Sequence, residues 1–178
     1  LCNDAPLEPN ATMPHQFQAV GDPTEGALLI MAARLGFWKT KLDKALPRIA
    51  EKPFDATRKR MTTVHMLPLA TVPIPEVLKL LVSERLGLGK APYTAFTKGS
   101  VGSLMEVSSR VWVNGQAEPL DERWHQKIFT DNDQLARNGM RVLGIAFRPL
   151  DAEKVDADGQ MLDGRTLEQN LIFIGMVG

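Results

Sequence analysis

Hydrophobic residues recur at helical spacing in the first third of the chain. A stretch from Thr24 to a stop at Gly36 carries apolar residues at Ala27, Leu28, Met31, Ala32 and Leu35. This period, with a proline just before it, predicts an α-helix. A second, shorter helix is predicted over residues 39–46, where Pro47 ends it.

Most later segments follow strand patterns. Residues 48–54 and 60–66 read as two strands around the polar turn 55–58. Asn114-Gly115 is a strong hairpin signal between residues 110–113 and 116–119. Further strands are predicted at 93–98, 140–148 and 171–177, and helices at 102–107 and 121–137. Mixed helices and hairpins predict an α+β fold with a mainly antiparallel, twisted sheet flanked by helices.

Three stretches lack a clear pattern. Residues 1–20 are rich in Pro, Asn and Asp and are predicted to form loop. Residues 67–92 are interrupted by prolines, with a short helix predicted at 76–86, and are interpreted as an insertion. Residues 150–168 are acidic and contain glycine, which predicts a solvated loop or a short helix. The length of 178 residues fits one domain over 1–178.

Composition excludes several classes of function. The chain has 21 basic and 21 acidic residues, so it lacks the basic footprint of a nucleic-acid-binding protein. One cysteine allows no intrachain disulfide, and three scattered histidines predict no metal site. No apolar run is long enough to span a bilayer, and no glycine-rich phosphate loop occurs.

Six short segments stand out in order along the chain. They are LCNDA at 1–5, GDPTEGALL at 21–29, PFDATRKRMT at 53–62, FTKGS at 96–100, MRVLGIAFR at 140–148 and IFIGMVG at 172–178. Together they resemble the landmarks of the nucleotide-binding domain of P-type cation-transporting ATPases, in the calcium and sodium/potassium pump branch. Residues 67–92 and 150–168 match that family poorly. Because the chain opens at Leu1, we expect a fragment excised from a larger pump.

The resemblance assigns an adenine site to three residues first. Phe54 matches the aromatic residue that stacks on adenine, a contact that needs only two π-faces. By pattern alone, a phenylalanine packed in the core is the better interpretation. Lys98 and Gly99 match the family's lysine-glycine pair, where lysine contacts the nucleotide and glycine leaves room for the ligand. The alternative is a surface lysine before a turn.

Three further residues complete the implied site. Glu25 matches a carboxylate near the adenine amino group, although an acid in a first helical turn is also favoured by the helix dipole. Lys59 matches a lysine beside the base or triphosphate. Arg141 matches an arginine whose guanidinium suits phosphate oxygens, or it is an exposed strand-end residue.

The chain departs from the family at two places. Ala56 stands where the calcium pumps have an arginine. Either Arg58 or Arg60 compensates, or Arg58-Lys59-Arg60 is partly a solvated charge run. Residues 100–102 are Ser-Val-Gly where Ala-Pro-Glu is usual, which affects the loop after Gly99 and hence ATP affinity.

The resemblance implies a function for the chain as part of a pump. It predicts a cytoplasmic domain of an integral membrane protein, monomeric when isolated, that binds ATP with Mg²⁺ carried by the nucleotide. The γ-phosphoryl group would pass to an aspartate in the phosphorylation domain, so no catalytic residue is expected here. Partners would be the phosphorylation, actuator and transmembrane domains of the same polypeptide, with calcium the leading candidate ion. The alternative is a non-catalytic interaction domain with a degenerate nucleotide site.

Overall fold

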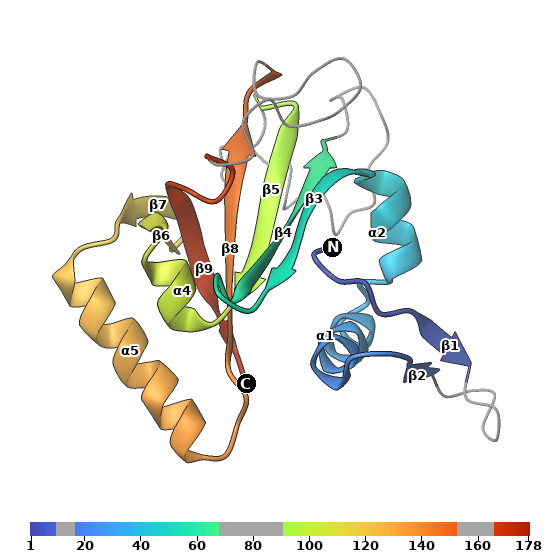
Figure 1. Cartoon of the computed structure of the whole chain (residues 1–178), viewed down its shortest axis with the longest axis horizontal. Coiled ribbons are helices and arrows are strands. Elements are labelled where there is room, and N and C mark those ends of the chain that lie inside the picture. The colour runs from blue at the N-terminus through green and yellow to red at the C-terminus, as the bar shows by residue number, and fades with distance from the viewer. Residues whose placement is uncertain (10–16, 68–90, 153–165) are drawn as a thin grey trace.

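A seven-stranded sheet forms the centre of the computed structural model, which describes residues 1–9, 17–67, 91–152 and 166–178 (Figure 1). Its strands are β3 (Arg48–Asp55), β4 (Arg60–Met66), β5 (Tyr93–Gly99), β6 (Ser108–Val113), β7 (Gln116–Pro119), β8 (Leu143–Leu150) and β9 (Leu171–Val177). They follow the spatial order β3-β4-β5-β8-β9-β6-β7. All neighbouring pairs are antiparallel except β6 and β9, which are parallel. The predicted α+β, mainly antiparallel fold is therefore confirmed.

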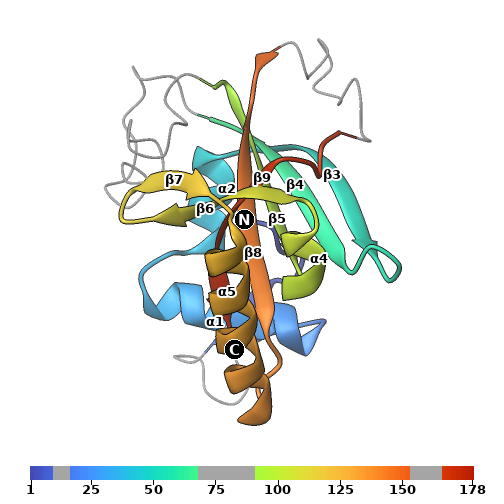
Figure 2. The same cartoon turned by 90° about the vertical axis from the view of Figure 1, so that its left-hand side faces the viewer.

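Helices cover both faces of this sheet. On one side lie α1 (Pro23–Arg34) and α2 (Lys39–Ala45), and on the other lie α4 (Val101–Met105) and α5 (Glu122–Arg137). Figure 2, viewed from the α5 side, shows α5 in front of the sheet. Within the part of the chain that the structure describes, no helix is long and apolar enough to cross a membrane.

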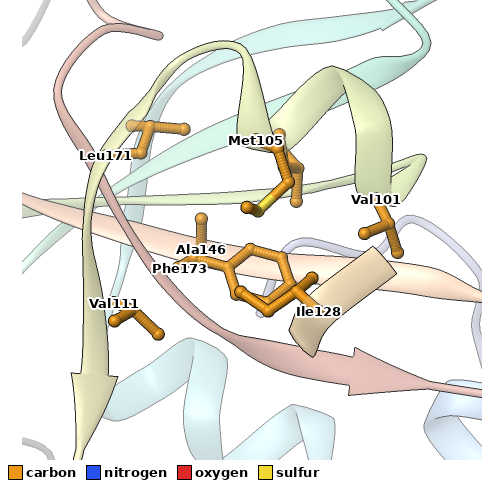
Figure 3. Close-up of a cluster of buried hydrophobic side chains, with 8 residues drawn as sticks. Val101, Met105, Val111, Ile128, Ala146, Leu171 and Phe173 are labelled. Carbon is orange, nitrogen blue, oxygen red and sulfur yellow. The ribbon is translucent and has the colours of Figure 1, made fainter. Parts of the chain in front are cut away.

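Strand alternation divides the core into two main layers. Ala146 packs in a cluster with α4 and α5, whereas its neighbour Phe147 packs in a cluster with α2. Phe173 and Ile172 on β9 divide in the same way. Successive strand side chains point to opposite faces, so one sheet can serve both layers. Figure 3 shows the first cluster, with Ile128 of α5 beside Phe173.

Local sequence explains the ends of the helices. Asp22 caps α1 by accepting hydrogen bonds from the backbone N–H groups of Thr24 (2.9 Å) and Glu25 (3.1 Å), and Pro23 occupies its first turn. Asp121 caps α5 in the same way, by accepting from the N–H of Trp124 at 3.0 Å. Gly139, with a positive φ of 76°, follows α5 as its predicted stop.

Several bounds differ from the sequence predictions, and two differences among the strands have a clear local cause. Residues 1–20 were predicted to be loop, but β1 (Leu7–Pro9) and β2 (Phe17–Ala19) form a small antiparallel pair. Three-residue strands are too short to show an alternating pattern. The strand predicted from residue 140 begins at Leu143, because only from there does it have pairing partners on β9 and β5.

The two poorly matched regions lie mostly outside the described residues. This applies to the helix predicted at 76–86 and to most of the insertion at 67–92. For residues 150–168, the described ends are mixed: Asp151 and Ala152 are exposed, whereas Leu150, Leu167 and Glu168 are buried. Leu150 and Leu167 pack together in a third cluster with Val64 and Ala95. The buried carboxylate of Glu168 forms ion pairs with Arg58 and Arg60.

Candidate functional site

One cavity of about 400 Å³ brings all six predicted site residues together. It lies where β3 ends, β5 ends and β8 begins, because Asp55 pairs with Arg60, Arg60 with Gly99 and Gly99 with Gly144. The N-terminus of α1 lies at the same end of the sheet (Figure 1). The lining residues are Asp22, Thr24, Glu25, Phe54, Lys59, Lys98, Gly99, Ser100, Arg141, Val142 and Leu143.

Phe54 presents an apolar ring to solvent at this cavity. It lies on β3 and is 63% exposed, so the alternative of a packed core phenylalanine is wrong. An exposed phenylalanine gains little from packing, and one that lines a concave site is available for stacking. Val142 and Leu143 add apolar surface to the same cavity.

Glu25 and Lys98 form an ion pair in the wall of the cavity. Their side chains are 18% and 11% exposed. Glu25 also accepts hydrogen bonds from the backbone N–H groups of Asp4 (2.9 Å) and Ala5 (3.0 Å). It lies in the first turn of α1, where a negative charge is favoured by the helix dipole. Glu25 therefore both interacts favourably with the helix dipole and lines the cavity.

Gly99 is required by its neighbouring strand. A Cβ atom there would lie 2.5 Å from the backbone oxygen of Lys59 and 2.6 Å from the Cβ of Arg60. Packing against the neighbouring strand is thus one reason for this glycine, and the prediction that it also leaves room for a ligand stays a prediction. The next residue, Ser100, caps α4, with its side chain accepting from the N–H of Ser103 at 3.3 Å. The Ser-Val-Gly sequence thus begins a helix directly behind Lys98-Gly99.

Lys59 lies in the turn between β3 and β4 in a left-handed conformation, with φ of 52°. Residues other than glycine rarely adopt this conformation, which is less stable for them. The turn is fixed from both sides: the N–H of Lys59 donates to the carbonyl of Asp55 (2.7 Å), and its own carbonyl accepts from the N–H of Ser100 (3.0 Å). The exposed side chain of Lys59 lines the cavity.

Arg141 lies just before β8 and is exposed at the cavity. Its positive charge interacts with the carboxylate of Asp22, which lines the same cavity. The backbone N–H of Glu25 is the main cause of a lowered pKa at Asp22, with Thr24 and the positive charge of Arg141 adding to it. The cavity thus carries two carboxylates, both engaged by the protein, and the three cations Lys59, Lys98 and Arg141.

A buried ion network beside the cavity was not found by sequence reasoning. Glu168 is 3% exposed and accepts hydrogen bonds from Arg58 Nη1 (2.5 Å), Thr62 Oγ1 (2.9 Å) and Arg60 Nε (3.1 Å). Burial alone would raise the pKa of Glu168, but the bonds from Arg58 and Thr62 outweigh it and lower the pKa. Neither arginine lines the cavity, and their side chains are only 23% and 13% exposed, whereas Lys59 between them is exposed. The charge run is therefore only partly solvated, and compensation for Ala56 stays a prediction.

Metal ligands are not gathered at the cavity. Across residues 1–9, 17–67, 91–152 and 166–178, no three His, Cys, Asp or Glu side chains are placed to hold a metal ion. His65 is fully buried, with Nδ1 2.8 Å from the carbonyl oxygen of Leu46 and Nε2 2.9 Å from Thr63 Oγ1. Desolvation lowers the pKa of His65 to about 4, so it is a neutral core residue.

A family model and several known proteins that match this chain all point to the same family. The model of the family described as P-type ATPase, cytoplasmic domain N, matches residues 1–178. Calcium-transporting ATPase 1 of Bacillus cereus is 33% identical over 178 residues, which is 100% of this chain and 16% of that protein. Cation-transporting ATPase pma1 of Synechocystis is 31% identical over 179 residues, again 100% of this chain and 16% of the relative.

A eukaryotic relative shows the same partial coverage. The sodium/potassium exporting P-type ATPase cta3 of Schizosaccharomyces pombe is 28% identical over 178 residues, which is 100% of this chain and 14% of that protein. The chain therefore spans about one sixth of the length of these relatives.

Proposed function

The chain belongs to the P-type ATPase cytoplasmic domain N family, and from this premise we propose that it binds ATP through the adenine base. The observation that carries the proposal is the convergence of Glu25, Phe54, Lys59, Lys98, Gly99 and Arg141 on one cavity. These residues come from four separate segments of sequence, and the motifs selected them without reference to the fold.

The cavity supplies the chemistry that a nucleotide needs. Phe54 offers a π-face to the base, a contact that contributes about 1–3 kcal/mol per base in single-stranded nucleic-acid complexes. Lys98 lies in the wall, where it can donate to the base edge, and Lys59 and Arg141 are exposed cations for the phosphates. Mg²⁺ would enter with the triphosphate, as its counter-ion.

In the full pump this domain would position ATP for reaction elsewhere. We expect it to present the γ-phosphoryl group to an aspartate of the phosphorylation domain, on the cytoplasmic side of a membrane. The actuator and transmembrane domains would be the other partners in the same polypeptide. The isolated chain would bind ATP without turnover. Two relatives bear the name calcium-transporting ATPase 1, and calcium is our proposal for the transported ion.

A titration with a matched pair of variants tests the proposal. Phe54→Ala should weaken ATP binding at least about tenfold, since it removes the stacking surface. Phe129→Ala is the control, because Phe129 is also exposed (40%) but lies on α5 and does not line the cavity. Isothermal calorimetry or amide chemical shifts would measure both affinities.

The result also separates the two functions that the sequence left open. An unchanged affinity in Phe54→Ala would overturn the adenine site. If the unaltered chain shows no ATP binding at millimolar concentration, a non-catalytic interaction domain becomes the better explanation of the fold.

A further inference from the structure

The segment of residues 1–5 is anchored in the domain, with Asp4 as its exposed residue. Asn3 and Ala5 are each 4% exposed, and Cys2 Sγ lies 3.5 Å from the backbone oxygen of Met61, to which it donates. Arg48 Nη2 donates to the carbonyl oxygens of Leu1 (3.3 Å) and Asn3 (3.0 Å). The segment 1–5 is therefore part of the folded body, and the groups that hold it in place can be identified.

Glu25 connects this segment to the cavity. Its Oε2 accepts from the N–H groups of Asp4 and Ala5, and its Oε1 pairs with Lys98 Nζ. The backbone is tied as well, since Asn3 Nδ2 donates to the carbonyl oxygen of Glu25 at 2.9 Å. A single carboxylate thus contacts the start of the chain with one oxygen and a cavity lysine with the other.

The hydrogen-bonding capacity of the pair indicates which partner meets a ligand. A carboxylate offers about four acceptor sites, and Glu25 uses three of them on protein donors. An ammonium has three donors, and the pair with Glu25 uses one of those of Lys98. Lys98 therefore keeps capacity for a ligand, whereas Glu25 is nearly saturated by the protein.

We propose that Glu25 is a positioning residue that orients Lys98 for the nucleotide and couples occupation of the cavity to the order of residues 1–5. The proposal rests on the proposed function. A lysine side chain has many rotamers, and the ion pair selects one that borders the cavity. Coupling between two sites is reciprocal, so a nucleotide on Lys98 stabilises the contacts of Glu25 with Asp4 and Ala5.

Two other roles for Glu25 predict different outcomes. If Glu25 acted only as a negative charge beside an anionic ligand, neutralising it would strengthen ATP binding. If it accepted from the adenine amino group, neutralising it would weaken the binding of ATP but leave unchanged a nucleotide that lacks this amino group. Positioning of Lys98 predicts weaker binding of both nucleotides.

The experiment measures the affinities of Glu25→Gln and the unaltered chain for ATP and for purine riboside triphosphate, which lacks the 6-amino group. We expect Glu25→Gln to weaken both by a similar factor of about ten. Asp121→Asn is the control: it also removes a carboxylate while the asparagine still caps its helix, α5, but it lies outside the cavity, and its affinity for both nucleotides should be unchanged. Tighter binding by Glu25→Gln, or a loss confined to ATP, would overturn the proposal.

Amide hydrogen exchange at Asp4 and Ala5 supplies the second readout. Nucleotide should slow their exchange in the unaltered chain and have no such effect in Glu25→Gln. Lys98→Met should also speed their exchange, although Lys98 contacts neither amide, because Glu25 loses its other partner. Unchanged exchange in both variants would refute the coupling. If the unaltered chain binds neither nucleotide, the proposed function fails, and exchange in the ligand-free variants still decides whether Glu25 and Lys98 anchor the segment.

Discussion

Replacement of Glu168 by glutamine should be among the most destabilising conservative changes in the described structure. The carboxylate is 3% exposed and faces three cations, Arg58 at 2.5 Å, Arg60 at 3.1 Å and Lys52 at 3.6 Å. Glutamine keeps the shape and one acceptor oxygen but removes the charge. Its amide group would also place donors against guanidinium donors, which cannot pair with them.

The size of the effect follows from burial. Loss of one partner from a buried ion pair costs about 3–5 kcal/mol, because the remaining charge is left uncompensated. Here Arg58 and Lys52 are 23% and 32% exposed, so water can solvate part of their charge. We therefore expect Glu168→Gln to lower the free energy of unfolding by about 2 kcal/mol.

Urea denaturation followed by tryptophan fluorescence would measure this change. Glu118→Gln is the matched control, since Glu118 and Arg123 form an exposed pair at 3.9 Å, with side chains 31% and 73% exposed. That exposed pair should contribute less than about 0.5 kcal/mol. Because the pKa of Glu168 is lowered in the folded state, its stabilisation should be present above the ordinary pKa of 4.5 and be lost as pH falls through the folded value.

A near-neutral result would refute this reasoning. If the two variants unfold at the same urea concentration, with the same dependence on urea, the buried network contributes no more than a surface pair. The expected contribution of Glu168 and its ion pairs with Arg58 and Arg60 to the stability of the fold would then be wrong.

Three further predictions concern stability and binding together. Gly99→Ala should lower the free energy of unfolding by about 1–3 kcal/mol in urea denaturation, because the added Cβ would meet the Lys59 backbone. Gly102→Ala is the control, because a Cβ at Gly102 would meet no neighbouring atom. Lys59→Gly should leave stability equal or raise it by up to about 1 kcal/mol, by relieving the left-handed conformation, yet weaken ATP binding in a calorimetric titration. For His65, with a folded pKa of about 4 against an ordinary 6.5, stability should fall by about 2 kcal/mol from pH 7 to pH 5, since the unfolded chain then binds the extra proton. A histidine NMR titration midpoint near 6.5 for His65 would contradict this last expectation.

The fold was largely predictable because its elements carry local signals. The hairpin at Asn114-Gly115 has positive φ at both residues, 49° and 87°, as its sequence demands. The start of α1 was marked by Pro23 and by an acidic residue in its first turn. The pair of β1 and β2 was missed because three residues per strand leave no period to detect.

The site was harder to derive, because its geometry depends on contacts between distant segments. The motifs selected residues that line one cavity, but they gave no reason to connect Glu25 with Asp4 and Ala5. Glu168 lies more than 100 positions from its partners Arg58 and Arg60, in a stretch whose acidic composition indicated solvent. Ion pairs of this kind follow from the sheet topology and leave no mark on local sequence.

The place of β9 in the sheet has a consequence for biosynthesis. Among the strands of the central sheet, β9 is the last to leave the ribosome, yet it lies between β8 and β6. Until residues 171–177 emerge, the strands β3, β4, β5 and β8 have no connection through the sheet to the hairpin of β6 and β7. Until then, the first core layer also lacks Phe173 and the second lacks Ile172. A nascent chain therefore carries two incomplete half-sheets with exposed edges, and cooperative folding must wait for a strand that follows all the others.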